Sequence, residues 1–189
     1  RPVVSAITNI SLDHTQLLGS TLVDIAYEKA EIIKNERPVV SAPQAEPAER
    51  VLRKVVANKK SALHLVGKDW WYQLVEMDWD GSIAYMGSGD HKVPVEIGMP
   101  GGFQIENAAV ALEVLNVAAQ EGLPISRQAR ISAMENTRWP GRLELVQRDP
   151  HVIVDSAHNP HSIEQVVRAL WDLSTEEQLA GRKVFVFGC

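Results

Sequence analysis

One arginine follows a bend that should hold its side chain in a fixed position. Arg142 comes directly after a Trp-Pro-Gly sequence, which interrupts any helix and predicts a linker over residues 136–144. A planar guanidinium binds phosphate oxygens through two parallel hydrogen bonds. An arginine in a linker between two domains could therefore neutralise a γ-phosphate as the domains close. The alternative is a structural arginine that pairs with Glu144.

Two histidines and one aspartate stand where parallel sheets bind their ligands. His14 follows a predicted strand at residues 3–8, and Asp155 and His158 lie at and after the end of a predicted strand at residues 152–155. Open α/β sheets bind substrates and cofactors at the carboxyl ends of their strands. Asp155 and His158 could there orient an incoming amine, or reach a metal and a nucleotide across a cleft. The alternatives are a loop histidine that caps backbone groups at residue 14 and a helix cap at residue 155.

Lys29 shares one face of a predicted helix with apolar side chains. Residues three and four positions apart are neighbours on a helix, and the neighbours of this lysine are Ile25, Ala26, Ile32 and Ile33. An amine in that setting is poorly solvated, which favours the neutral form that can react with CO₂ to give a carbamate. A carbamate is an anionic oxygen ligand that suits Mg²⁺. The alternative is a side chain that extends past its apolar neighbours to water.

The first part of the chain predicts an α/β scaffold for these residues. Apolar runs at residues 3–8 and 38–42 are typical of buried strands. A helix over residues 21–34 begins with a capping box formed by Thr21 and Asp24, and the next helix begins near Pro47. This order of strand, helix, strand and helix is that of a parallel α/β sheet.

The middle of the chain changes to a different pattern. Residues 61–100 contain strands broken by turn residues, including an Asp-Gly pair that ends at Gly81, and predict an antiparallel insert. Helical spacing returns over residues 104–120 and ends at Gly122, and a further helix begins at the cap Ser126. Gln104 opens the first of these helices.

The residues after the linker predict a second unit. A strand at 152–155, a helix at 162–173 and a strand at 183–187 would form one β-α-β unit. We therefore expect two domains, with residues 1–144 in one and residues 145–189 in the other.

The composition excludes several classes of protein. The 189 residues carry a formal net charge of −5 and 45% hydrophobic residues, which argues for a globular fold and against a nucleic-acid binder. No apolar run is long enough to span a membrane, and the start of the chain lacks the layout of a signal peptide. Cys189 is the only cysteine, so no internal disulfide can form. We expect a cytoplasmic protein with small-molecule partners and no membrane or nucleic-acid partner.

Five sequence patterns together resemble one protein family. They lie at residues 7–15, 28–34, 104–112, 139–144 and 155–161. In this order and spacing they resemble the folylpolyglutamate synthase/dihydrofolate synthase branch of the Mur ligase family. The resemblance implies the later part of a P-loop-type central ATPase domain with an antiparallel strand insert, followed by the start of a Rossmann-like C-terminal domain. It also implies ATP and Mg²⁺ as cofactors, and folate and glutamate as substrates.

The resemblance further implies ligand-binding roles for residues of the first unit. The matching histidine of the family ligates Mg²⁺, which assigns His14 to the metal. The matching lysine is carbamylated, which assigns Lys29 to the metal and to catalysis. The matching amides recognise adenine, which assigns Gln104 and Asn107 to the nucleotide. From the sequence alone, these two residues would be hydrogen-bonding groups at a helix start.

Roles at the linker and in the second unit complete the implied mechanism. ATP phosphorylates a folate carboxylate, and the amine of glutamate attacks the acyl phosphate. Arg142 would bind the nucleotide and act in catalysis, together with Asp155 and His158. The family's usual glycines are replaced by Ser11, Glu31 and Ser156, and its histidine before Gln104 by Phe103.

The Gly-Lys-Ser loop that holds ATP phosphates in the family is absent from these residues. By resemblance it belongs before Arg1, so we expect the 189 residues alone to be inactive. Two other interpretations stay open. One is a related Mur-type ligase of cell-wall synthesis, and the other is a non-catalytic folded remnant.

Overall fold

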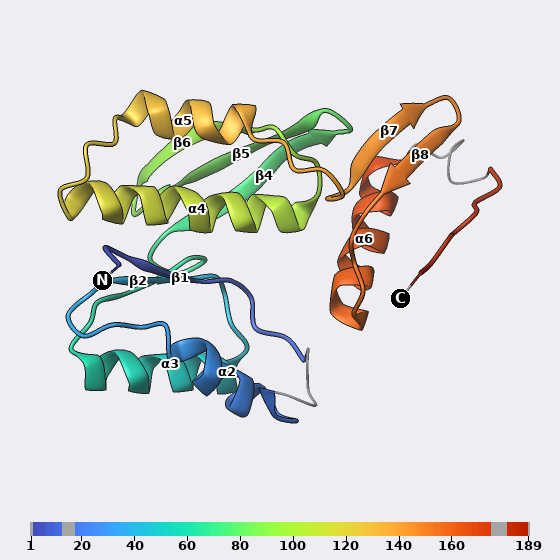
Figure 1. Cartoon of the computed structure of the whole chain (residues 1–189). Helices are drawn as coiled ribbons and strands as arrows, with labels where there is room; N and C mark the ends of the chain where they lie inside the picture. Colours follow the sequence, from blue (N-terminus) through green and yellow to red (C-terminus); the bar gives the residue numbers. More distant parts are fainter. Residues whose placement is uncertain (1, 13–17, 175–180, 189) are drawn as a thin grey trace.

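The computed structural model describes residues 2–12, 18–174 and 181–188. A larger part contains two sheets and the long helix α4 (Gly102–Gln120) between them. A smaller part contains a two-stranded sheet and helix α6 (Pro160–Leu173). Figure 1 shows the smaller part at the end of α4 where that helix begins. No helix in the described ranges is long and apolar enough to cross a membrane.

A parallel sheet forms the base of the larger part. Strands β1 (Ser5–Ile7), β2 (Val39–Ser41) and β3 (Leu63–Leu65) pair in that order, all parallel. Helices α2 (Leu22–Ala30) and α3 (Glu46–Lys59) cover one face, while α4 lies on the other face (Figure 1). The predicted alternation of strands and helices is therefore confirmed.

Local capping explains where the helices of this sheet begin. Thr21 and Asp24 form the predicted capping box at the start of α2, and proline stands in the first turn of α3. The helix α2 ends at Ala30, four residues before the predicted end at residue 34. Beyond it the chain turns so that Ile33 becomes fully buried, and it then enters β2.

An antiparallel sheet packs on α4. Strands β4 (Trp71–Asp78), β5 (Gly81–Ser88) and β6 (His91–Ile97) form a meander. The predicted hairpin is present, with Trp79 and Asp80 as its two turn residues and Gly81 as the first residue of β5. Asp78 Oδ1 tightens this turn by accepting hydrogen bonds from the backbone amides of Asp80 and Gly81, at 2.8 and 3.1 Å. One detail of the prediction was wrong: β3, inside the range 61–100, pairs in parallel with β2.

Two helices complete the larger part as predicted. Helix α4 ends before Gly122, which has a φ of 97°, a left-handed conformation that glycine adopts without steric cost. Helix α5 (Arg127–Asn136) begins at Ser126, whose side chain accepts a hydrogen bond from the backbone amide of Ala129. The core between α4 and the sheets contains the buried side chains of Met86, Ile97 and Ile105, among others.

The smaller part differs from the predicted β-α-β unit. Strands β7 (Glu144–Arg148) and β8 (His151–Val154) form an antiparallel hairpin, and α6 follows, capped by Asn159. Residues 183–187 form no strand. Val186 is 95% exposed, and none of the described strands lies beside this segment. An extended segment without a neighbouring strand cannot form the hydrogen-bond ladder that defines a sheet.

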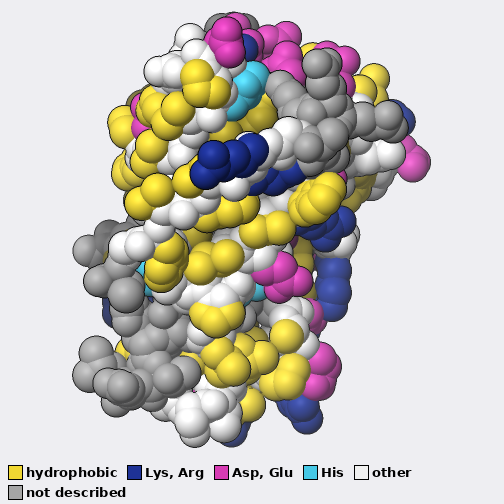
Figure 2. All heavy atoms as spheres, turned by 90° about the vertical axis from the view of Figure 1, so that its right-hand side faces the viewer, with side chains coloured by type: hydrophobic (Ala, Val, Ile, Leu, Met, Phe, Trp, Pro, Cys, Tyr) yellow, Lys and Arg dark blue, Asp and Glu magenta, His cyan; other side chains and the backbone are white. Residues whose placement is uncertain are grey.

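Hydrophobic side chains also reach the surface of this part. Trp171 of α6 is 59% exposed. Figure 2 shows that hydrophobic and charged groups alternate on the side of the molecule that lies at the right in Figure 1.

Candidate functional site

The linker places Arg142 on a tight turn between α5 and β7. Gly141 adopts a φ of 71°, and its backbone amide donates a 2.7 Å hydrogen bond to Glu144 Oε2. Arg142 is exposed on this turn. The carboxylate of Glu144 binds the turn backbone, and the ion pair between Glu144 and Arg142 does not occur within the described part of the chain. The competing interpretation of Arg142 as the partner of Glu144 is therefore wrong.

Asp155 holds the same turn from the end of β8. Its Oδ2 accepts a hydrogen bond from the backbone amide of Leu143, and its Oδ1 accepts one from Ala157, each at 2.7 Å. The amide of Ser156 donates to the carbonyl of Gly141 at 2.9 Å. Because Asn159 is the N-cap of α6, the interpretation of Asp155 as a helix cap is wrong.

His158 lies in the same loop and is exposed. Its Nδ1 is 3.0 Å from the backbone oxygen of Ser156, and since a carbonyl only accepts, Nδ1 carries the proton of this hydrogen bond. In the neutral ring Nε2 then holds the lone pair. The structure thus brings Arg142, Asp155 and His158 together around one loop and one turn.

The start of α4 lies against this turn. Phe103 packs with Leu143 in a small core that joins the two parts of the molecule. Gln104 is buried, with 4% of its surface exposed, and its Oε1 accepts a 3.1 Å hydrogen bond from Asn107 Nδ2. Asn107 is exposed. Of the two residues predicted to recognise the adenine, only Asn107 is accessible to a ligand in this structure.

A partly buried carboxylate, that of Glu106, stands next to these two residues, and the sequence prediction missed it. Glu106 Oε2 accepts a 3.0 Å hydrogen bond from the Tyr72 hydroxyl. Burial raises the pKa of Glu106, and the hydrogen bond from Tyr72 and the charge of His161 oppose that rise. Burial also raises the pKa of Tyr72, with Glu106 adding to the effect. The sequence signal for this pair was weak, because the two residues are 34 positions apart.

Lys29 does not occupy the environment that the helical pattern predicted. Ile25, Ala26 and Ala30 are buried, but Lys29 is exposed. The helix ends at Ala30, so Ile32 no longer shares its face and is 45% exposed. The premise of a poorly solvated amine is therefore wrong. The alternative of a side chain that reaches water fits the structure, and the carbamate remains a prediction that rests on the family resemblance.

His14 lies outside the described residues, but the loop that leads toward it is well anchored. The side chain of Gln44 bridges the ends of β1 and β2. Its Nε2 donates to the carbonyl of Thr8, and its Oε1 accepts from the amide of Ile10, each at 2.9 Å. Asn9 Nδ2 donates to the carbonyl of Pro43 at 3.2 Å. These polar groups fix the carboxyl edge of the parallel sheet, where the sequence predicted a ligand site.

The described residues do not by themselves complete a metal site. No group of three or more histidine, cysteine, aspartate or glutamate side chains lies close enough to hold a metal ion in the described ranges. Lys29 is exposed, and the carboxylate of Asp155 already accepts hydrogen bonds from two backbone amides. Because His14 lies outside the described residues, the predicted Mg²⁺ site of His14 and carbamylated Lys29 stays a prediction.

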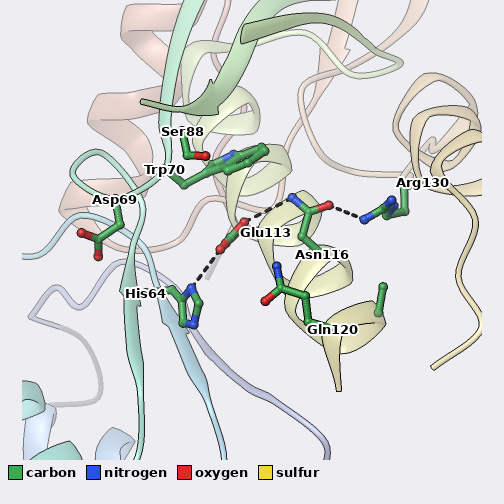
Figure 3. A pocket seen from close by; sticks show the side chains of 9 residues that line it. His64, Asp69, Trp70, Ser88, Glu113, Asn116, Gln120 and Arg130 are labelled. Carbon is green, nitrogen blue, oxygen red and sulfur yellow. Dashed lines mark hydrogen bonds and ion pairs between the residues drawn. The ribbon is translucent and has the colours of Figure 1, made fainter. Parts of the chain in front are cut away.

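A cavity of about 540 Å³ lies away from all of the predicted residues. It is lined by residues of β3, the turn after it, β5, α4 and α5. Figure 3 shows a chain of contacts through part of its polar lining, from His64 through Glu113 and Asn116 to Arg130. His64 Nδ1 lies 3.0 Å from Glu113 Oε1, Asn116 Nδ2 donates to Glu113 Oε2 at 3.2 Å, and Arg130 Nη1 donates to Asn116 Oδ1 at 2.6 Å. These groups satisfy one another, so the network serves to connect α4 with β3 and α5.

Comparison with known proteins identifies both parts of the chain. The family model of the Mur ligase middle domain matches residues 1–115, and that of the Mur ligase glutamate ligase domain matches residues 141–189. The solved structure of an FPGS–AMPPCP–folate complex has a TM-score of 0.87 at 31% identity, covering 93% of this chain and 43% of the other. The predicted fold class and family resemblance are confirmed.

Two curated relatives carry names in the predicted branch. The folylpolyglutamate synthase of Lacticaseibacillus casei is 32% identical over 177 residues, which cover 93% of this chain and 41% of the relative. The dihydrofolate synthase/folylpolyglutamate synthase of Escherichia coli (strain K12) is 33% identical over 161 residues, which cover 85% of this chain and 35% of the relative. This chain spans well under half the length of either relative.

Proposed function

Because this chain belongs to the Mur ligase family, we propose that it forms part of an ATP-dependent ligase that adds L-glutamate to folates. The names of the relatives support folate as the substrate class. In this proposal, residues 1–144 belong to the central ATPase domain and residues 145–189 to the C-terminal domain. The active site lies where these domains meet.

The geometry of the turn at residues 141–143, which we call the hinge between the two parts, carries this proposal. Arg142 is exposed on a turn that is hydrogen-bonded to the loop after β8, and the start of α4 packs beside it. A folate carboxylate would attack the γ-phosphorus of ATP, and ADP would leave. Arg142 would offset the negative charge on the transferring phosphoryl group through two N–H donors, which a fixed turn can aim in advance.

The loop after β8 would serve the second step. The amine of glutamate attacks the acyl carbon, and phosphate leaves. His158, held in this loop by the contact of its Nδ1 with the backbone oxygen of Ser156, would help to orient that amine. Asn107, exposed at the start of α4, would contact the adenine, and Gln104 would support it through their mutual hydrogen bond.

The predicted metal ligands belong to the same proposal. His14 and carbamylated Lys29 would hold Mg²⁺, which offsets charge on reacting phosphates. His14 lies outside the described residues, so no step of the mechanism is derived through the metal.

A substrate panel tests the proposal. The purified enzyme that contains this chain is incubated with ATP, Mg²⁺, glutamate and tetrahydrofolate, and ADP release and glutamylated folate are measured. We expect both products in equal amounts. Turnover with a UDP-muramoyl substrate and none with folates would identify a cell-wall ligase. No ADP release with either substrate would favour the non-catalytic interpretation.

A further inference from the structure

Two carboxylates hold the backbone on either side of Arg142. Before it, Glu144 Oε2 accepts the amide proton of Gly141 at 2.7 Å. After it, Asp155 Oδ2 accepts the amide proton of Leu143, also at 2.7 Å. Hydrogen bonds from backbone amides to carboxylates are among the stronger hydrogen bonds in proteins. The peptide group before Gly141 and the one after Arg142 are thus fixed, while the side chain of Arg142 stays exposed.

The backbone at Leu143 supports the same conclusion. Leu143 has a φ of 48°, an unfavourable conformation for a residue with a Cβ, and its side chain is completely buried. Such a conformation persists only where the surroundings enforce it. Here the enforcing groups are Asp155, which binds the amide, and the apolar side chains of Phe103 and Leu173, which pack in the same core.

The same contacts join the turn to the smaller part of the molecule. Asp155 also accepts the amide proton of Ala157 at 2.7 Å, and Ser156 donates to the carbonyl of Gly141 at 2.9 Å. Residues 141–143 are therefore bonded directly to residues 155–157. A rotation between the two parts that keeps these hydrogen bonds would have to take place before Gly141, in the Trp-Pro segment, where Trp139 is 65% exposed. Such a rotation would also move Leu143 against Phe103 of α4, with which it packs.

We propose that Glu144 and Asp155 are positioning residues that fix the turn around Arg142 to the C-terminal part, so that the arginine moves with that part as a preorganised unit. The inference rests on the proposed function for its catalytic consequence. In this proposal Asp155 positions Arg142 by binding the backbone amide of Leu143. Glu144, which the sequence suggested only as an ion-pair partner of Arg142, positions it by binding the backbone amide of Gly141.

Amide hydrogen exchange tests the positioning directly. In Glu144→Ala, the amide of Gly141 should exchange roughly tenfold to a hundredfold faster, the effect expected for loss of one hydrogen bond to a charged group. Glu144→Gln should restore protection, because its amide oxygen can accept the same proton. Glu164→Ala, which removes an exposed carboxylate from α6, serves as the matched control. In Asp155→Ala, the amides of Leu143 and Ala157 should lose protection together.

The catalytic readout separates this proposal from the proposed function. In the complete enzyme, Glu144→Ala should lower kcat roughly tenfold with little change in the KM for ATP, and Glu144→Gln should recover most of the rate. Unchanged exchange at Gly141 in Glu144→Ala would overturn the proposal. So would faster exchange with an unchanged kcat, provided that Arg142→Ala is itself impaired. If Arg142→Ala has full activity, the phosphate role fails, and so does the catalytic consequence proposed here.

Discussion

The stability of this fold should depend on the protonation of His64. The hydrogen bond with Glu113, 3.0 Å long, is the main cause that raises the pKa of His64 above its ordinary value of 6.5, while burial acts in the opposite direction. Asp69 adds a smaller attraction. Because the folded pKa is raised, the protonated ring contributes stability that is fully present below about pH 6.5 and is lost as the pH rises through the folded pKa.

The magnitude of this pH-dependent stabilisation depends on how far the side chains of His64 and Glu113 are exposed to solvent. A hydrogen bond to a charged group contributes roughly 1.5–3 kcal/mol. The side chain of His64 is 29% exposed, and that of Glu113 is 10% exposed. Solvent screening at this exposure reduces the pH-dependent contribution to about 1 kcal/mol. For a protein of this size, that corresponds to a change in Tm of roughly 2–4 °C.

Thermal unfolding between about pH 6 and about pH 9 measures the effect against a matched variant. The amide of His64→Gln can still donate to Glu113 but does not titrate, so the variant removes only the contribution of this histidine. We expect the Tm of the unmodified protein to fall by roughly 2–4 °C more than that of the variant over this range. Parallel Tm curves for the two proteins would refute the reasoning, because all other titrating groups are common to both.

Four further predictions concern the hinge, the nucleotide and the metal. Arg142→Lys keeps the charge but loses the planar fork, so kcat of the complete enzyme should fall roughly 10²-fold; a wild-type rate would leave Arg142 without a catalytic role. Leu143→Ala should lower the free energy of unfolding by about 3 kcal/mol in denaturant titrations, whereas Val152→Ala, at a 41% exposed position, should change it little. The 189 residues contain no Gly-Lys-Ser loop, so calorimetry should detect no micromolar binding of ATP·Mg²⁺ to this chain alone; such binding would contradict the electrostatic argument. Lys29 should carry a ¹³CO₂-derived carbamate in the complete enzyme with Mg²⁺ and ATP bound, and an unmodified amine under those conditions would exclude the modification.

The sequence predicted best those elements whose limits are set by neighbouring residues. Thr21, Ser126 and Gly122 act through contacts within a few positions of themselves, and the structure confirms all three. Strand pairing depends on distant partners. The sequence therefore could not show that β3 belongs to the parallel sheet, or that residues 183–187 have no neighbouring strand in the described part of the chain.

For the candidate site as well, the sequence predicted only what near neighbours in the chain determine. The pattern around Lys29 correctly identified the buried face through Ile25 and Ala26, but it assumed that the helix continued. Because α2 ends at Ala30, the spacing of three and four residues no longer describes which side chains surround the amine. The difference of a few residues between the predicted and the observed end of this helix thus changes the environment of Lys29 from the apolar one that was expected to an aqueous one.

The hinge shows how one missed strand can hide a functional contact. Short motifs identified Arg142 and Asp155 separately, but no strand was predicted at residues 144–148. In the β7–β8 hairpin, Glu144 pairs with Val154, so the next positions outward along the two strands are Leu143 and Asp155. That register places the carboxylate 2.7 Å from the amide it binds. Had β7 been predicted as the partner of β8, the antiparallel register would have brought Asp155 to the residue after Arg142, and its interpretation as a helix cap would have been unnecessary.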